Sequence, residues 1–238
     1  AIWCFYSTPF ITDCTFAENA AGFGAGGVGC YFSDAIINNS LFVDSSTIWG
    51  GGICTHTAFP TITNNIILKN SASLNSFPNI INNTIVNNSA RKNGGGIASG
   101  HSSSPIIVNT ILWNRRDEVY LDDSSSITIM YSNVKGGYEG EGNIDAIPQF
   151  LSLRDDNYHL RPTSPCIGTG TNTGAPLFDK DGNPRPSPTG SNCDIGAYES
   201  RFGRPREAQL APQKTKKLVF TWGKIKQKPR ILGKNPGF

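Results

Sequence analysis

The chain is poor in charge and in methionine, and it has no long apolar run. Only 16% of its 238 residues are charged, and a single methionine is present. No apolar run approaches the roughly 20 residues of a transmembrane helix, and no signal peptide opens the chain. The sequence therefore predicts no transmembrane segment. Because residue 1 already lies inside the repeats described below, we interpret the chain as starting in the middle of a repeat.

Positive charge is scarce in the body of the chain and concentrated in its tail. Residues 1–200 contain 10 Lys and Arg against 17 Asp and Glu, whereas residues 201–238 contain 11 against 1. We expect the tail to be a solvated, disordered end, and the alternative is that it binds anionic polymers. The body has no basic groove with interleaved aromatic residues, so we expect no nucleic-acid partner.

Glycine, proline, asparagine and isoleucine dominate where helix-forming residues are missing. The 26 glycines and 15 prolines suit many short strands that are joined by turns. Six cysteines are present, and none of them forms a CxxC metal pair. The composition predicts an all-β protein.

A repeat with a period of 18 to 26 residues runs through the first half of the chain. One column holds Phe or Ile with Asn or Ser three residues later, and its members are Phe16, Phe42, Ile67, Ile85 and Ile111. A second column lies five residues earlier and comprises Ile11, Ile37, Ile62, Ile80 and Ile106. A glycine pair precedes the strands at Gly26, Gly51 and Gly95, and it is missing where the period shortens to 18. Self-similarity at such a period marks a solenoid.

The apolar residues alternate with polar ones, as strands with a period of two require. Parallel strands need crossover connections, which are nearly always right-handed. We therefore predict a right-handed parallel β-helix over residues 1–136, a C-terminal closing segment over 137–200 and a basic tail over 201–238. We also predict that asparagines stack at the corners as amide ladders, and the two expected stacks are Asn64 with Asn82, and Asn65 with Asn83 and Asn109.

The two columns and the GlyGly[Val/Ile] strings resemble the repeats of bacterial cell-surface β-helix proteins, including the polymorphic outer-membrane type and the pectin-lyase-like superfamily. From Gly142 the strings GNIDAIPQFLSLRDDNYHLRPTSPCIGTG and DKDGNPRPSPTGSNCDIGAYES resemble the closing block of choice-of-anchor Q proteins. Together the two likenesses cover roughly residues 1–200. They imply an extracellular or cell-surface location, although the tail carries no anchoring signal.

Two groups of charged residues are candidates for catalysis. Glu18, Asp44 and Lys69 follow the Phe/Ile column by two residues, as do Asn87 and Trp113. Lyases of this fold place calcium ligands and a basic proton acceptor on neighbouring coils, so this column permits that chemistry. Opposite charges on adjacent strands also simply stabilise a sheet, and we favour this structural interpretation.

The second group comprises Asp122 and Asp123 in the densest charged cluster of the chain. Paired acids can bind calcium or protonate a glycosidic oxygen. The alternative, which we favour, is a polar loop that ends a coil.

A metal site and a carbohydrate site are also conceivable. Asp179, Asp181 and Asn183 offer closely spaced oxygen ligands for calcium, but they lack the EF-hand spacing, and a plain turn is the favoured interpretation. Trp49, Trp113 and Tyr120 lie between or beside the columns and are candidates for stacking on sugar rings. Cys166 and Cys193 flank the 179–183 turn, either as a disulfide that closes it or as two buried thiols.

These observations predict a monomeric surface module for display or adhesion that contacts a polysaccharide or cell-surface glycan. Calcium is a possible ligand. No acid/base set is assembled by the sequence, so we do not expect catalysis. The alternative is a polysaccharide lyase or glycoside hydrolase that uses Glu18, Asp44 and Lys69 or the Asp122 cluster.

Overall fold

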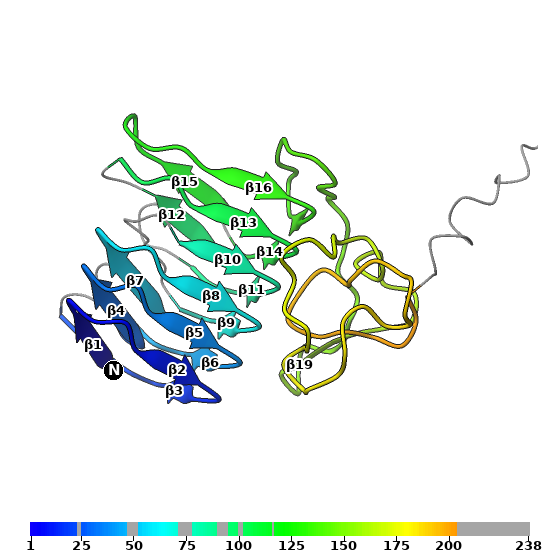
Figure 1. The fold of residues 1–238 in the computed structure, drawn as a ribbon, viewed down its shortest axis with the longest axis horizontal. Coiled ribbons are helices and arrows are strands. Elements are labelled where there is room, and N and C mark those ends of the chain that lie inside the picture. Colours follow the sequence, from blue (N-terminus) through cyan, green and yellow to red (C-terminus); the bar gives the residue numbers. More distant parts are fainter. Residues whose placement is uncertain are drawn as a thin grey trace, which may run out of the picture.

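The computed structural model describes residues 1–22, 25–46, 52–70, 78–89, 95–99, 102–115 and 117–203. These residues form a parallel β-helix, whose stacked coils run from the N-terminus to about residue 134, with the C-terminal segment at their side (Figure 1). Within these ranges there is no helix, and so none that could cross a membrane. The predicted all-β class and the solenoid are confirmed.

The described coils contribute strands to three larger parallel sheets and to one two-stranded parallel sheet. The first sheet contains β1 (Ile2–Phe5), β4 (Val28–Tyr31) and β7 (Ile53–His56). The second contains β2 (Phe10–Thr12), β5 (Ile36–Asn38), β8 (Thr61–Thr63), β10 (Asn79–Ile81), β13 (Ile106–Val108) and β16 (Thr128–Met130). The third contains β3 (Thr15–Ala17), β6 (Leu41–Val43), β9 (Ile66–Leu68), β11 (Thr84–Val86), β14 (Ile111–Trp113) and β17 (Asn133–Val134). β12 (Ile97–Ser99) pairs in parallel with β15 (Val119–Leu121), and β18 (Phe150–Ser152) pairs in antiparallel with β19 (Asn157–Leu160).

The predicted columns stack as expected through the first four members and then shift by one residue. In the second sheet Ile80 pairs with Ile107, so that Ile106 points outward. In the third sheet Ile85 pairs with Leu112. The assignments of Ile106 and Ile111 to the inward columns were therefore wrong. Both positions are flanked by a second apolar residue, and hydrophobic pattern alone cannot choose between such neighbours.

The interior of the coils is a ladder of like residues. Phe16 and Phe42 stack with their ring centroids 4.8 Å apart and their planes 6° apart. Gly27 lies against Phe42, and a Cβ atom at residue 27 would sit 2.5 Å from a Phe42 ring carbon and 2.4 Å from the Gly52 carbonyl oxygen. The recurring glycine therefore leaves room for the close approach of the next coil.

Of the two predicted asparagine stacks, Asn64 and Asn82 are level with each other, but their amides donate to the C-terminal segment. The second stack forms a ladder at the corner between the second and third sheets, with one correction. The Asn65 backbone N–H and side-chain Nδ2 both donate to Asn83 Oδ1, at 2.9 and 3.1 Å. The next member is Thr110, whose Oγ1 accepts from the Asn83 N–H. Asn109 was wrongly placed here, because Val108 pairs with Ile81 and this pairing puts residue 109 level with Asn82.

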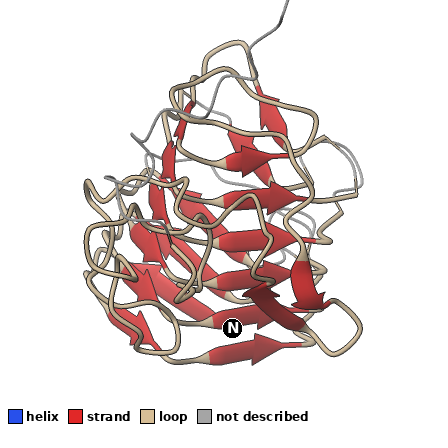
Figure 2. Ribbon diagram, turned by 90° about the vertical axis from the view of Figure 1, so that its right-hand side faces the viewer, coloured by secondary structure: helices blue, strands red, loops and turns tan. Residues whose placement is uncertain are grey.

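The C-terminal segment uses its first residues to cover the end of the coils and the rest to cover their flank. Tyr138 packs against the coil core, and the Ile144 N–H donates to the Ser132 carbonyl oxygen. Residues 147–203 lie along the third sheet and along its corner with the second sheet, on the side that faces the viewer in Figure 2. There the outward residues of the third sheet pack against the segment and form a second core, which includes Ile66, Leu68, Val86, Ile111, Phe150, Tyr158, Leu160 and Ile195.

Candidate functional site

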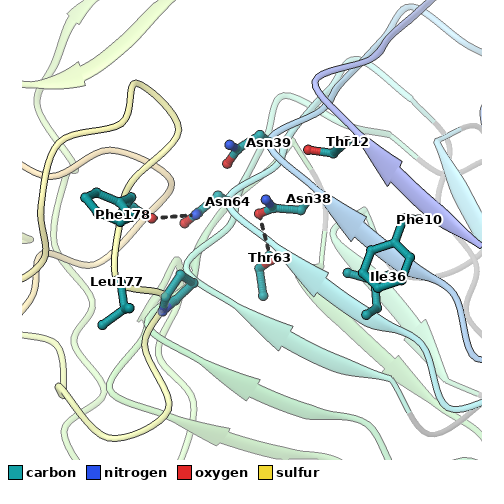
Figure 3. Close-up of a pocket in the computed structure, with 10 residues that line it drawn as sticks. Phe10, Thr12, Ile36, Asn38, Asn39, Thr63, Asn64, Leu177 and Phe178 are labelled. Atoms are coloured by element: carbon teal, nitrogen blue, oxygen red, sulfur yellow. Dashed lines mark hydrogen bonds between the residues drawn. The ribbon is translucent and has the colours of Figure 1, made fainter.

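A groove lies between the outer face of the second sheet and the loop at residues 176–178 (Figure 3). Its volume is about 440 Å³. The lining residues are Phe10, Thr12, Ile36, Asn38, Asn39, Thr63, Asn64, Pro176, Leu177 and Phe178. Concave sites of this size that combine apolar walls with a few polar groups are the usual form of small-ligand sites.

Apolar side chains stand on both sides of this groove. Phe10 and Ile36 are in-register partners on β2 and β5, and alternation along the strand turns them outward because Ile11 and Ile37 fill the interior. Leu177 stands on the other side, and it is 77% exposed, like Phe10. Large exposed apolar side chains that gather around one hollow indicate a contact surface.

The floor of the groove is a polar row that crosses three coils. Thr12, Asn38 and Thr63 are register partners on β2, β5 and β8. Thr63 Oγ1 donates to Asn38 Oδ1 at 2.9 Å (Figure 3), so the Asn38 amide is oriented with its Nδ2 donor available for another partner. Asn39 also lines the groove, and its Oδ1 is buried without a hydrogen-bond partner among the described residues.

The loop that forms the opposite wall is tied to the coils. Asn64 Nδ2 donates to the Phe178 carbonyl oxygen at 2.8 Å (Figure 3). The Lys180 ammonium donates to the Asn39 carbonyl oxygen, and burial lowers the pKa of this ammonium while Asp13 and Asp181 oppose the shift. These bonds join two segments far apart in sequence, so the groove exists before a ligand enters.

All ten residues that line the groove are uncharged. It therefore holds no acid or base that could transfer a proton at neutral pH. The arrangement suits binding of a neutral ligand through apolar faces and hydrogen bonds. The groove was not predicted from the sequence, because Thr12, Asn38 and Thr63 are ordinary strand residues and the opposite wall comes from a distant segment.

The candidate column of Glu18, Asp44 and Lys69 follows the third sheet. All three adopt positive φ, between 50° and 55°, in the turn after the strands β3, β6 and β9. Lys69 Nζ lies 3.9 Å from Asp44 Oδ2 and 3.6 Å from Asp156 Oδ2. An ammonium between two carboxylates matches the structural interpretation of this column. Trp113 is not a member of this column, because it pairs with Val86, one position before Asn87.

Asp122 and Asp123 lie in the turn that follows β15. Asp122 Oδ1 accepts hydrogen bonds from the Ser124 N–H and hydroxyl; Asp122 is half-buried and Asp123 is exposed. This geometry is that of a polar turn. In the same cluster Glu118 is buried, where its carboxylate accepts hydrogen bonds from the Asn114 N–H and amide and ends a ladder of asparagines. Burial raises the pKa of Glu118.

The side chains of the proposed calcium site do not converge. Asp179 Oδ1 accepts the N–H groups of Asp181 and Asn183, and Asp179 Oδ2 accepts Asn183 Nδ2 and the Glu199 N–H. Asp181 Oδ2 lies instead 2.6 Å from His159 Nε2. In the part of the chain that the structure describes, no three His, Cys, Asp or Glu residues could hold a metal ion. The hydrogen bonds are those of a tight turn.

The aromatic candidates have different surroundings. Trp49 lies outside the described residues. Trp113 lines a second groove, which is taken up below, and Tyr120 is 37% exposed on β15. A stacked and mostly exposed aromatic surface was missed, and it comprises Trp3, Phe5, Tyr6, Tyr31 and Phe32. Its signal in the sequence is the recurrence of aromatic residues at a spacing of 26.

The cysteines are free thiols. Cys4 and Cys30 are register partners, as the repeat indicates. Cys166 accepts a hydrogen bond from Asn133 Nδ2, and burial raises the pKa of both Cys166 and Cys193 to about 12. Cys166 and Cys193 are therefore two buried thiols and not a disulfide in this structure.

No family model, curated protein or solved structure matches this chain. A fold of this kind supports many unrelated activities, so it does not identify one by itself. Function is therefore argued from the groove on the second sheet.

Proposed function

We propose that the protein is an extracellular or cell-surface β-helix module that binds a neutral carbohydrate chain in the groove on the second sheet, without catalysis. The GlyGly and Phe/Ile columns support a place in the pectin-lyase-like superfamily, and the 142–200 motifs support a choice-of-anchor Q closing block. The observation that carries the carbohydrate proposal is the uncharged groove with apolar walls and an amide and hydroxyl floor.

Sugars match this chemistry because each ring has an apolar face of C–H groups and a rim of hydroxyls. The C–H face would lie against Phe10 or Leu177, and the rim would bond to Asn38 and Thr63. The aromatic surface of Trp3, Phe5 and Tyr6 on the same first coil would accommodate further parts of a glycan.

A lyase or hydrolase is the second candidate, and the cluster of Asp44, Lys69 and Asp156 is the observation in its favour. The Lys69 ammonium is already ion-paired with both carboxylates, and none of these three residues lines the groove. The binding proposal is favoured for this reason. The test below also separates the two.

Phe10→Ala is expected to weaken binding to a neutral polysaccharide about tenfold, because an aromatic contact in a groove contributes of the order of 1 to 2 kcal/mol. The measurement is affinity electrophoresis or calorimetry over a panel of neutral and acidic polysaccharides and their oligosaccharides. Ile106→Ala is the control, because Ile106 is an exposed residue of the same sheet that does not line the groove. Its binding should equal that of the wild type.

Two results would contradict the proposal. Equal binding by the Phe10 and Ile106 variants would remove the groove as the site. Unsaturated products that absorb in the near ultraviolet, or new reducing ends, would make the protein an enzyme and would direct attention to Lys69 and its partners.

A further inference from the structure

A second groove lies between the third sheet and the first part of the C-terminal segment, with a volume of about 410 Å³. It is lined by Val86, Asn87, Trp113, Ile147, Pro148, Gln149, Phe150, Leu153 and Arg161. Six of these residues are apolar or aromatic, and Ile147 and Leu153 are more than half exposed. The groove can therefore hold an apolar body against a tryptophan wall.

Arg161 is the one formal charge among these described lining residues. Its Nε and Nη2 each donate at 3.1 Å, to the carbonyl oxygens of Phe150 and Leu151 respectively. These two bonds fix the plane of the guanidinium, and Nη1 has no partner among the residues that the structure describes. A guanidinium held in this way presents a fixed positive donor to an anion.

Two side-chain amides border the same space. Gln149 Oε1 accepts a hydrogen bond from Thr163 Oγ1 at 2.6 Å, which leaves the Nε2 donor of this amide available. Asn87 stands on the coil side, where its amide hydrogen-bonds to the Tyr158 hydroxyl. That hydroxyl donates to Asp156, which also pairs with Lys69 outside the lining. Asp156 is thus already paired with a hydroxyl and an ammonium.

We propose that this second groove binds a small carboxylate whose body is an apolar ring. The carboxylate pairs with Arg161, with Gln149 as a second donor, and the ring lies between Trp113 and Leu153. Charge complementarity selects the anion, since the lining offers one positive group and no acid. The apolar walls select a ring without hydroxyls over a sugar acid, whose hydroxyls would lose water without gaining partners. This site is independent of the carbohydrate proposal.

The test is calorimetry or ligand-observed NMR with benzoate, benzyl alcohol and glucuronate as probes. We expect benzoate to bind with a dissociation constant on the order of 1 mM, as a fragment of this size allows. Benzyl alcohol and glucuronate should each bind at least about tenfold more weakly, because one lacks the charge and the other the apolar ring.

Matched variants locate the site. Arg161→Gln should weaken benzoate binding about tenfold or more, whereas Arg154→Gln, at a neighbouring exposed arginine, should not. Leu153→Ala should weaken it several-fold, whereas Leu151→Ala, at an exposed leucine outside the lining, should not. If loss of the Arg161 hydrogen bonds destabilises the fold, the comparison of Leu153→Ala with Leu151→Ala still tests the site.

Four results would overturn the proposal. They are no binding of benzoate at about fifty times the expected constant, equal effects within either variant pair, glucuronate binding as tightly as benzoate, and benzyl alcohol binding as tightly as benzoate.

Discussion

Replacing Asn83 by alanine is expected to destabilise the coils by about 3 to 5 kcal/mol. The Asn83 side chain is fully buried, and its Oδ1 accepts both the N–H and the Nδ2 of Asn65. Its own Nδ2 donates to the carbonyl oxygens of Ile62 and Ile81, at 2.7 and 3.0 Å. Alanine leaves the buried Asn65 N–H without an acceptor and removes a hydrogen bond from each of two interior carbonyl oxygens. A buried group left without a partner costs about 1 to 3 kcal/mol, and each lost bond adds about 1 kcal/mol.

Hydrogen exchange measured by mass spectrometry is the appropriate readout, because repeat arrays do not always unfold in one step. Protection should fall most in the peptides that contain residues 61–66, next to the substituted coil. Asn79→Ala is the control, since Asn79 is an exposed residue of the same coil, and its effect should stay within about 0.5 kcal/mol. Equal effects of the two substitutions would show that the buried ladder does not stabilise the coils.

The ladder also illustrates how far the sequence could predict this fold. Asn65 and Asn83 were placed correctly because each follows an isoleucine column whose period was unambiguous. Asn109 was placed one position off, since Ile106 and Ile107 are both apolar and either could have pointed inward. The register is decided by the hydrogen bonds of Thr110 to neighbouring coils and by the packing of the C-terminal segment on Ile111. These contacts join residues that are far apart in the sequence, so the local pattern does not contain them.

The position of the C-terminal segment on the flank of the coils was not predicted either. Its trace in the sequence is the run of apolar residues in Ile66–Leu68, where the outward positions are as apolar as the inward one. Strands that are buried on both faces have this composition. The covering segment itself is nearly a hundred residues away, so the pattern indicates that a cover exists but not which residues supply it.

Candidate sites were harder to predict than the fold, because charged residues are visible in the sequence whereas a groove depends on tertiary packing. Lys69 and Asp44 are indeed neighbours, yet Asp156 joins them from the C-terminal segment, so that the ammonium lies between two carboxylates. The groove of Phe10, Asn38 and Leu177 contains no charged residue. The groove forms because the loop at residues 176–178 packs beside the outer face of the second sheet. No local sequence pattern indicates this packing.

A buried arginine, Arg185, stabilises the C-terminal segment, and its replacement is the last prediction. Arg185 Nη1 donates to Glu199 Oε2 at 2.7 Å, and both side chains are inaccessible to solvent. Arg185 Nη2 also donates to the Gly196 carbonyl oxygen. Asp194 lies close to the pair and accepts the N–H groups of Gly168 and Ser200. Asp179 is buried in the same segment, so one cation faces several buried acids.

This imbalance sets the pH dependence of the segment. Burial raises the pKa of Glu199 to about 7, with the Asp194 charge as the next cause, and burial also raises the pKa of Asp194. A carboxyl whose pKa is raised on folding binds its proton more tightly in the folded state. Its contribution to stability is therefore complete below about pH 4.5 and is lost as the pH rises through about 7. The free energy of unfolding of the wild type should fall across that window.

Arg185→Met is expected to destabilise the segment by about 3 to 5 kcal/mol at pH 8, because it leaves buried carboxylates without a counter-charge. The loss should be smaller at pH 5, where protonated Glu199 needs no cation. Urea unfolding and hydrogen exchange of residues 164–200 at both pH values measure it, with the exposed Arg154→Met as the control. Glu199→Gln should flatten the decline of stability between pH 5 and 8, and subtracting its profile from that of the wild type removes the contribution of the other titrating groups. An equal loss for Arg185→Met at both pH values, or a wild-type stability that rises from pH 5 to 8, would mean that these buried acids stay ionised throughout and that the single arginine suffices for all of them.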